Sequence, residues 1–215
     1  MDSVELARQV AAELHAHLVE SGANPWAPYE FVVAEATRRG IDVEPTAAGA
    51  AMLNGGRATF IAADDLILHE NVGSLFEKAF LVAHEIGHVE LGDDPDDESA
   101  PTIDPARAAE PSPVGIDRVV DYGRKQRREV QMDLFARELL LPRSVARELH
   151  VAGGLSASEI AEKLGAPFEV VSQQLLDALL LPPFPTKPTA AHEERPLNPL
   201  QATAAGHRGG AYLLE

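Results

Sequence analysis

The chain has 215 residues, 45% of them hydrophobic, and contains no cysteine. This length allows one well-buried domain with an appendage and is short for two full domains. Without cysteine, disulfides, thiolate metal sites and cysteine nucleophiles are excluded, so any metal site must use His, Asp or Glu side chains.

The net charge is −16, from 18 basic and 34 acidic residues. Binding to a phosphate backbone requires a basic surface, so we expect no direct contact with nucleic acid. No apolar run approaches the roughly 20 residues of a membrane helix, and the acidic start Met1-Asp2-Ser3-Val4-Glu5 does not resemble a signal peptide. We therefore expect a cytoplasmic protein with no membrane partner.

The N-terminal part is predicted to be helical. Apolar residues recur at every fourth position over residues 3–20, which is typical of an amphipathic helix: Leu6, Val10, Leu14 and Leu18. A second helix is expected over 28–39, from a proline to a glycine. Trp26, between them, is predicted to anchor the core, and His15 is predicted to lie on the surface.

A small antiparallel sheet is predicted next. Turn residues, Asn54-Gly55-Gly56 and Asp64-Asp65, separate short extended segments. These segments are residues 41–43, 51–53, 58–62 and 66–69. His69 ends the last of them, and we expect it to be exposed or to cap the strand rather than to line a cleft.

Helices are predicted for most of the remainder, over 72–91, 125–141, 143–150 and, as a pair, 156–180. A polar loop rich in Asp, Pro and Ala separates the first two, over 93–115. The pair has the outline of a helix-turn-helix, broken at Gly165-Ala166-Pro167. Its second helix begins with residues 168–175, which include no Lys or Arg, so a packing role is preferred to DNA binding.

The segment His84-Glu85-Ile86-Gly87-His88 lies within a predicted helix. Residues four apart share a helix face, so both imidazoles can bind one ion, and neutral imidazole suits zinc. Glu85 lies about 100° around the helix, where its carboxylate can take a proton from a water molecule that the ion activates. The alternative is a helix that displays His and Glu on its surface without binding a metal.

Two histidines leave the site incomplete, because catalytic zinc usually has three protein ligands. The acidic cluster at 93–98 is near in sequence, but Glu129 on the next long helix is better placed. Asp133, one turn later, can accept a hydrogen bond from a ligand imidazole. Tyr122 is a candidate to stabilise the transition state by polarising the scissile carbonyl. Manganese would suit such ligands too, although zinc is preferred.

Two segments together resemble the ImmA/IrrE metallopeptidases. The first is His84-Glu85-Ile86-Gly87-His88-Val89-Glu90-Leu91-Gly92, which is similar to the zinc motif of that family. The second runs from Glu129 to Pro142 and matches the pattern Glu, three residues, Asn or Asp, one residue, Phe-Ala, then an apolar run ending in Pro. Met132 departs from the small residue usual at its position. The resemblance covers roughly residues 25–180 and implies Glu129 as the third ligand.

The resemblance also implies a zincin-like core, a helical tail, and cleavage of a repressor or regulator protein. A second resemblance, to the start of a UvrD-like superfamily 1 helicase, lies in 196–215, where Gln201 would belong to the adenine-reading motif. The phosphate-binding loop that would follow is absent from this sequence. We therefore expect an N-terminal part of a peptidase–helicase fusion, with the helicase region as a partner.

The fold class expected is α+β: a zincin-like helical domain with a small antiparallel sheet over 1–150, then a helix-turn-helix-like tail packed on it over 151–182. A linker over 183–198 and a truncated helicase-like segment over 199–215 complete the prediction. The function expected is a zinc endopeptidase acting on a protein partner. The alternatives are a metal-binding sensor or regulatory module that cuts nothing, and a DNA-repair or phage-defence role that belongs mainly to the helicase.

Overall fold

The computed structural model describes residues 3–92 and 124–182 of the chain. These residues form a mixed α+β fold in which helices predominate over one three-stranded sheet. The first elements are α1 (Ser3–Glu20), α2 (Pro28–Arg38), β1 (Asp42–Thr46), the 3₁₀ turn η1 (Ala51–Leu53), β2 (Ala58–Ile61) and β3 (Leu66–Glu70). They are followed by α3 (Leu75–Leu91), α5 (Arg124–Leu140), α6 (Arg143–Arg147), the π-type turn η2 (Glu148–Ala152), α7 (Ala157–Leu164) and α8 (Phe168–Leu180).

The buried face of α1 is shifted around the helix from the face that the leucine repeat predicted. Its apolar members recur at helical spacing: Ala7, Ala11, Leu14 and Leu18. Leu6, expected on this face, is 44% exposed. Small alanines take its place because α1 packs closely against α5.

The sheet is mixed, so the prediction of an antiparallel sheet was wrong in part. Its strand order is β1-β3-β2, with β1 parallel to β3 and β2 antiparallel to β3. Residues 51–53, expected as a strand, form the 3₁₀ turn η1, which Asn54 ends with a φ of 50°. With that segment outside the sheet, β1 pairs directly with β3, running in the same direction.

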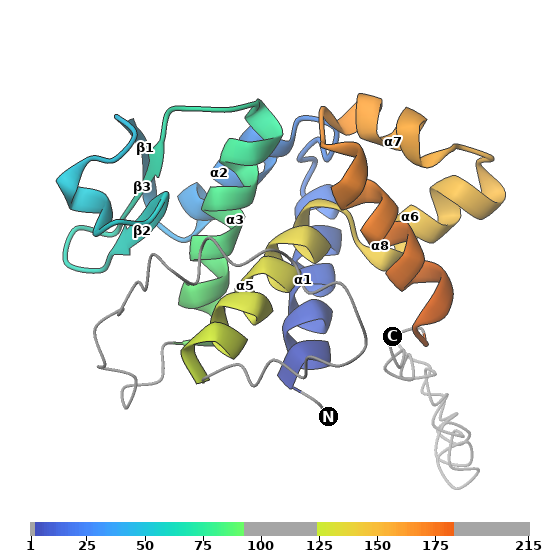
Figure 1. Ribbon diagram of the computed structural model, residues 1–215, viewed down its shortest axis with the longest axis horizontal. Helices are drawn as coiled ribbons and strands as arrows, with labels where there is room; N and C mark the ends of the chain where they lie inside the picture. Colours follow the sequence, from blue (N-terminus) through green and yellow to red (C-terminus); the bar gives the residue numbers. More distant parts are fainter. Residues whose placement is uncertain (1–2, 93–123, 183–215) are drawn as a thin grey trace, which may run out of the picture. The chain divides into compact units, whose positions relative to one another are not determined.

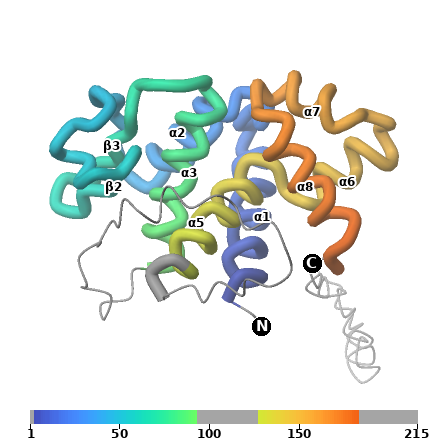
Figure 2. Tube along the Cα trace, in the orientation of Figure 1, coloured from blue at the N-terminus to red at the C-terminus, as the bar shows by residue number. Residues whose placement is uncertain are grey.

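Helix α3 packs on one side against β2 and β3 and on another side against α5 (Figure 1). Helix α1 packs against the side of α5 that faces away from α3. Helix α5 therefore lies between α3 and α1, as the Cα trace also shows (Figure 2). The core that results is built from alanine, leucine, isoleucine and phenylalanine side chains of these helices. Burial of such side chains is the main favourable contribution to folding.

Three polar or amphipathic residues differ from their predictions. His69 is fully buried, and its Nε2 lies 2.8 Å from the hydroxyl of Tyr29, while its Nδ1 lies 2.9 Å from the carbonyl of Glu70. His15 is also buried, with Nδ1 2.7 Å from the Leu139 carbonyl. Trp26, expected to anchor the core, is 37% exposed and carries the ammonium of Lys163 over its ring. Each buried imidazole therefore has the hydrogen-bond partner that its burial requires.

The tail helices α7 and α8 are joined by a short turn at Gly165, whose φ of 63° ends α7. Ser156 and Glu159 form a capping box that begins α7. The comparison of this pair with a helix-turn-helix stays a prediction. The polar loop over 93–115, the linker over 183–198 and the helicase-like segment over 199–215 lie outside the described residues. Within the described ranges, no helix has the length and apolar character needed to cross a bilayer.

Candidate metal centre

Helix α3 carries both histidines on one face. It begins at a capping box, in which Ser74 accepts a hydrogen bond from the backbone of Glu77 and the Glu77 carboxylate accepts one from the backbone of Ser74. The helix continues without interruption to Gly92. Because His84 and His88 are one turn apart on a regular helix, their imidazoles point to the same side.

The two imidazoles and a carboxylate from α5 converge on one point. The Nε2 atoms of His84 and His88 are 3.2 Å apart, and His84 Nε2 lies 3.3 Å from Glu129 Oε2. His88 Nε2 is 4.0 Å from Glu129 Oε1. One donor atom from each of the three residues therefore falls within 4.8 Å of the others, and the group can hold a metal ion.

Close packing of α3 on α5 brings Glu129 to the histidines. A Cβ atom built on Gly87 would lie 3.0 Å from the sulfur of Met132 and 3.0 Å from Cδ1 of Phe135. Both partners are fully buried. The missing side chain at residue 87 thus lets the two helices approach each other, and Met132, larger than the residue that the resemblance leads one to expect, fills the space beside it.

Asp133 fixes the orientation of the first histidine. Its Oδ1 accepts a hydrogen bond from Nδ1 of His84 over 2.9 Å. A carboxylate can only accept here, so Nδ1 carries a proton, and Nε2, on the side of His88 and Glu129, is the nitrogen that can bind an ion once it has lost its own proton. This is the arrangement by which carboxylates commonly orient metal-binding histidines.

The electrostatics of the group favour a cation. Burial lowers the pKa of His84, but hydrogen bonds to Asp133 and Glu129 outweigh this effect and raise the pKa to about 9. The imidazole of His84 therefore takes up a proton readily, because three carboxyl groups lie near it: those of Asp133, Glu129 and Glu85. A divalent cation bound at Nε2 would be stabilised by the same charges.

Glu85 lies beside the group but is not one of its three members. Burial raises the pKa of its carboxyl, while the charges of His84 and His88 and a hydrogen bond from the backbone of Phe60 lower it, and the net direction is upward. The contact with Phe60 shows that the carboxyl faces β2. Glu85 is thus placed between the metal-binding group and one edge of the sheet.

The donor set is of a kind that can hold a divalent ion such as zinc. A tetrahedral ion with bonds of about 2.0–2.1 Å separates its ligand atoms by about 3.3 Å. The separations of His84 Nε2 from His88 Nε2 and from Glu129 Oε2, 3.2 and 3.3 Å, agree with this value. The side chains of His84 and His88 are 16% and 19% exposed and that of Glu129 is 47% exposed, so an ion can enter from the Glu129 side.

The structure brings together five of the side chains that the sequence predicted for the site: His84, Glu85, His88, Glu129 and Asp133. Tyr122 and the acidic cluster at 93–98 lie outside the described residues. Two contributions were not predicted. One is the backbone of Phe60, and the other is Gly87 as the point of helix contact. The contact at Gly87 could have been found from the sequence. A glycine inside a predicted helix is unfavourable unless close packing requires it, and Gly87 lies between the two histidines of such a helix.

Comparison with protein-family models and with curated proteins finds no match for this chain.

Proposed function

We propose that this chain is a zinc-dependent endopeptidase that cleaves a protein partner, as the resemblance to ImmA/IrrE metallopeptidases implies. The observation that carries the proposal is the position of Glu85 next to the three-donor group of His84, His88 and Glu129. A zinc site with a purely structural role has no need of a carboxylate beside it that is not a ligand. A catalytic site needs such a group to move protons.

In this proposal His84, His88 and Glu129 hold the ion, and Asp133 keeps the His84 ring in position. Zinc, when bound, supplies a Lewis acid that polarises the substrate carbonyl and lowers the pKa of a nearby water. Glu85 accepts the proton of the attacking water and then delivers it to the nitrogen of the leaving amine. The burial of Glu85 supports this role, because a partly desolvated carboxylate is a stronger base.

The substrate segment is proposed to bind as an extended strand along β2. The backbone N–H of Glu70 donates to the carbonyl of Arg57 over 2.8 Å. From the register of β2 with β3, alternation then directs the peptide groups of Thr59 and Ile61 toward β3 as well. The peptide groups of Ala58 and Phe60 therefore point away from β3, toward the free edge. Phe60 faces Glu85 there, so a strand added at this edge would pass the proposed base.

Two variants test the proposal against the alternative of a metal-binding module that cuts nothing. Glu129→Ala should lose zinc, measured as metal per chain by plasma mass spectrometry, where the wild type holds about one zinc. Glu85→Gln should keep zinc and lose cleavage of a protein or peptide substrate by at least about a hundredfold. Equal cleavage by wild type and Glu85→Gln, with zinc retained in both, would refute the assigned base and favour the non-catalytic module.

A further inference from the structure

A pocket of about 290 Å³ lies beside the metal centre, between α3, α5 and α8. We call it the α3–α5–α8 pocket. Its apolar walls are Phe80 of α3, Leu134 of α5 and Val170 of α8. Asp133, Arg137, Glu169 and Gln173 complete its lining. The tail helix α8, predicted only to pack on the core, therefore forms one side of a space next to the ligands.

The pocket lies one helical turn from the three-donor group, and Asp133 belongs to its lining. Helices α3 and α5 run antiparallel, because His88 faces Glu129 and His84 faces Asp133. One turn further, Phe80 and Arg137 share the pocket. Four residues of helix span about 6 Å. Side chains on one face of an extended peptide are about 6.6–6.8 Å apart, which is nearly the same spacing.

Size and shape favour a large apolar side chain as the occupant. A cavity of roughly 150 Å³ lined by apolar groups suffices to bind benzene, and this pocket is larger. Phe80, Leu134 and Val170 are all partly buried and present apolar surface to it. An apolar side chain that enters the pocket removes its own surface and that of these three residues from water, which favours binding.

The charges of the pocket disfavour an acidic occupant. Asp133 and Glu169 contribute two carboxylates. Asp133 is paired with His84 and Arg137 with Asp177, so Glu169 is the lining charge for which the described residues show no ion pair. An acidic side chain in the pocket would therefore meet the charge of Glu169, with no unpaired cation among the described lining residues to balance it.

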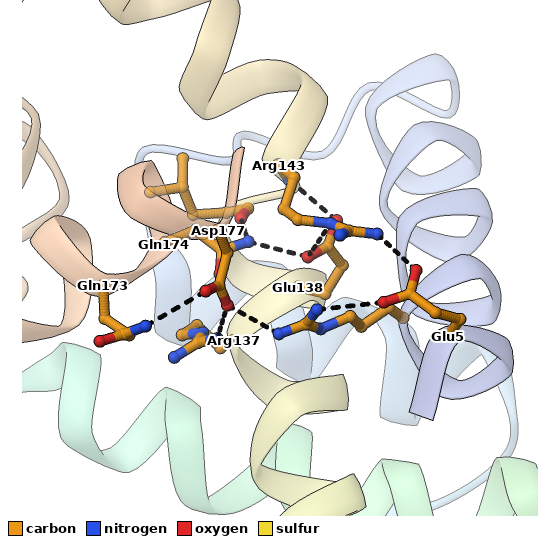
Figure 3. Close-up of polar contacts among 9 residues, drawn as sticks. Glu5, Arg137, Glu138, Arg143, Gln173, Gln174 and Asp177 are labelled. Atoms are coloured by element: carbon orange, nitrogen blue, oxygen red, sulfur yellow. Dashed lines mark hydrogen bonds and ion pairs between the residues drawn. The ribbon is translucent and has the colours of Figure 1, made fainter. Parts of the chain in front are cut away.

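The polar side of the pocket is fixed by hydrogen bonds. Asp177 accepts from Arg137 and, over 3.1 Å, from Nε2 of Gln173, and Arg8 of α1 donates to the same aspartate over 2.7 Å (Figure 3). In the close-up, the side chains of Gln173 and Arg137 are both directed to Asp177. Two lining residues are thus held before any ligand arrives, which reduces the entropy lost on binding.

We propose that the α3–α5–α8 pocket binds a large apolar side chain of the substrate, such as Leu, Met or Phe, at one fixed position relative to the scissile bond, and rejects acidic side chains there. This inference rests on the proposed function. It assigns α8 to substrate selection and makes Val170 and Glu169 residues that determine specificity.

Cleavage of a synthetic library of random decapeptides, with products sequenced by mass spectrometry, gives the residue preference at each position. The wild type should prefer large apolar residues at one position. Val170→Phe, which fills the pocket, should lower that preference relative to alanine by about tenfold or more. Leu176→Phe is the matched control, because Leu176 is an exposed residue of the same helix that does not line the pocket.

The charge of the pocket is tested in the same library. Glu169→Lys should raise cleavage at peptides with an acidic residue at that position, whereas Glu162→Lys, an exposed residue of α7 outside the pocket, should not. Identical preferences in wild type, Val170→Phe and Glu169→Lys would overturn the inference while leaving the peptidase itself intact.

A binding measurement separates this inference from the proposed function. N-acetyl-L-leucinamide, added at millimolar concentration to the full chain, should shift the methyl resonances of Val170 and Leu134 but not those of Leu176. Such shifts in a protein that cleaves no peptide would support the pocket and refute the peptidase. No shift at Val170 and Leu134 would overturn the pocket, whatever the cleavage assay gives.

Discussion

His84 Nδ1 lies 2.9 Å from Oδ1 of Asp133, so the helix that supplies the candidate ligand Glu129 also orients the first imidazole. Ligand and orienting group are one turn apart on α5, and they face histidines one turn apart on α3. The relative position of two helices therefore determines four of the side chains of the metal centre at once.

This relationship predicts the effect of Asp133→Asn. An amide can accept the proton of His84 Nδ1 but lacks the negative charge, so we expect the affinity for zinc to fall by about 10–100-fold with the fold retained. Competition with a chromophoric chelator measures the affinity, and circular dichroism checks the fold. Asp64→Asn, at an exposed turn between β2 and β3, should leave the affinity unchanged. Equal affinities in the two variants would contradict the assigned role of Asp133.

A second prediction concerns the contact at Gly87. The added methyl of Gly87→Ala would meet the Met132 sulfur and the Phe135 ring at 3.0 Å, in a region with no exposed surface. We expect a loss of about 1–3 kcal/mol in the free energy of unfolding, since overpacking outweighs the gain in helix propensity. Urea denaturation measures it. In a Met132→Ala background, Gly87→Ala should cost less than it does in wild type, and an equal cost in both backgrounds would assign the effect to Phe135 alone.

The acid stability of the fold should depend on Glu35. Burial raises the pKa of this carboxyl, but hydrogen bonds from Arg38 and Arg39 outweigh it and hold the pKa below its usual range. Arg39 also pairs with Glu90 of α3. A lowered folded-state pKa means that Glu35 stabilises the fold above the unfolded-state pKa of about 4.3, and that this contribution is lost as the pH falls through the folded-state pKa.

Denaturant unfolding of Glu35→Gln at pH 6 and pH 3.5 checks this expectation. The variant should be less stable than wild type by about 1–3 kcal/mol at pH 6, with a smaller difference at pH 3.5. Glu30→Gln, an exposed residue of the same helix, is the control. A constant difference between wild type and Glu35→Gln at both pH values would show that protonation of Glu35 has no part in acid unfolding.

The ion pairs of Asp177 predict a large effect of its removal. Its carboxylate accepts from Arg8 and Arg137, and all three side chains are mostly buried (Figure 3). Asp177→Ala leaves two buried guanidinium groups without this partner, so we expect a loss of about 3 kcal/mol in the free energy of unfolding. Thermal or urea denaturation measures it, with Asp64→Ala as the exposed control. A loss below about 0.5 kcal/mol would mean that water replaces the carboxylate.

The two residue pairs of the metal-binding group could be predicted from the sequence because the spacing within each pair is local, whereas the choice of Glu129 as third ligand depended on the resemblance to a family. Residues 84 and 88 share a face on any regular helix, and Glu129 and Asp133 do so on the next. Helix ends were predictable where capping residues mark them, as at Ser156 and Gly165. These features depend on neighbours within a turn or two.

What the sequence did not predict depends on contacts between distant segments. Residues 51–53 form a turn instead of a strand, and β1 pairs with β3 in parallel. The sequence of a short extended segment does not by itself reveal which strand it will pair with. His69 can be buried because its imidazole forms a hydrogen bond with the hydroxyl of Tyr29, 40 residues earlier in the chain. Val170 likewise lines the pocket because of the place where α8 packs, and the pattern of residues within α8 does not determine that place.

The antiparallel alignment of α3 and α5 has a consequence for how this chain can vary. His88 opposite Glu129, His84 opposite Asp133 and Phe80 opposite Arg137 form three levels of one interface. A substitution at one level leaves the others aligned. Insertion or deletion of one residue within either helix rotates everything beyond it by about 100° and separates the levels. The two helices should therefore accept changes of side chain far more readily than any change in their length between these residues.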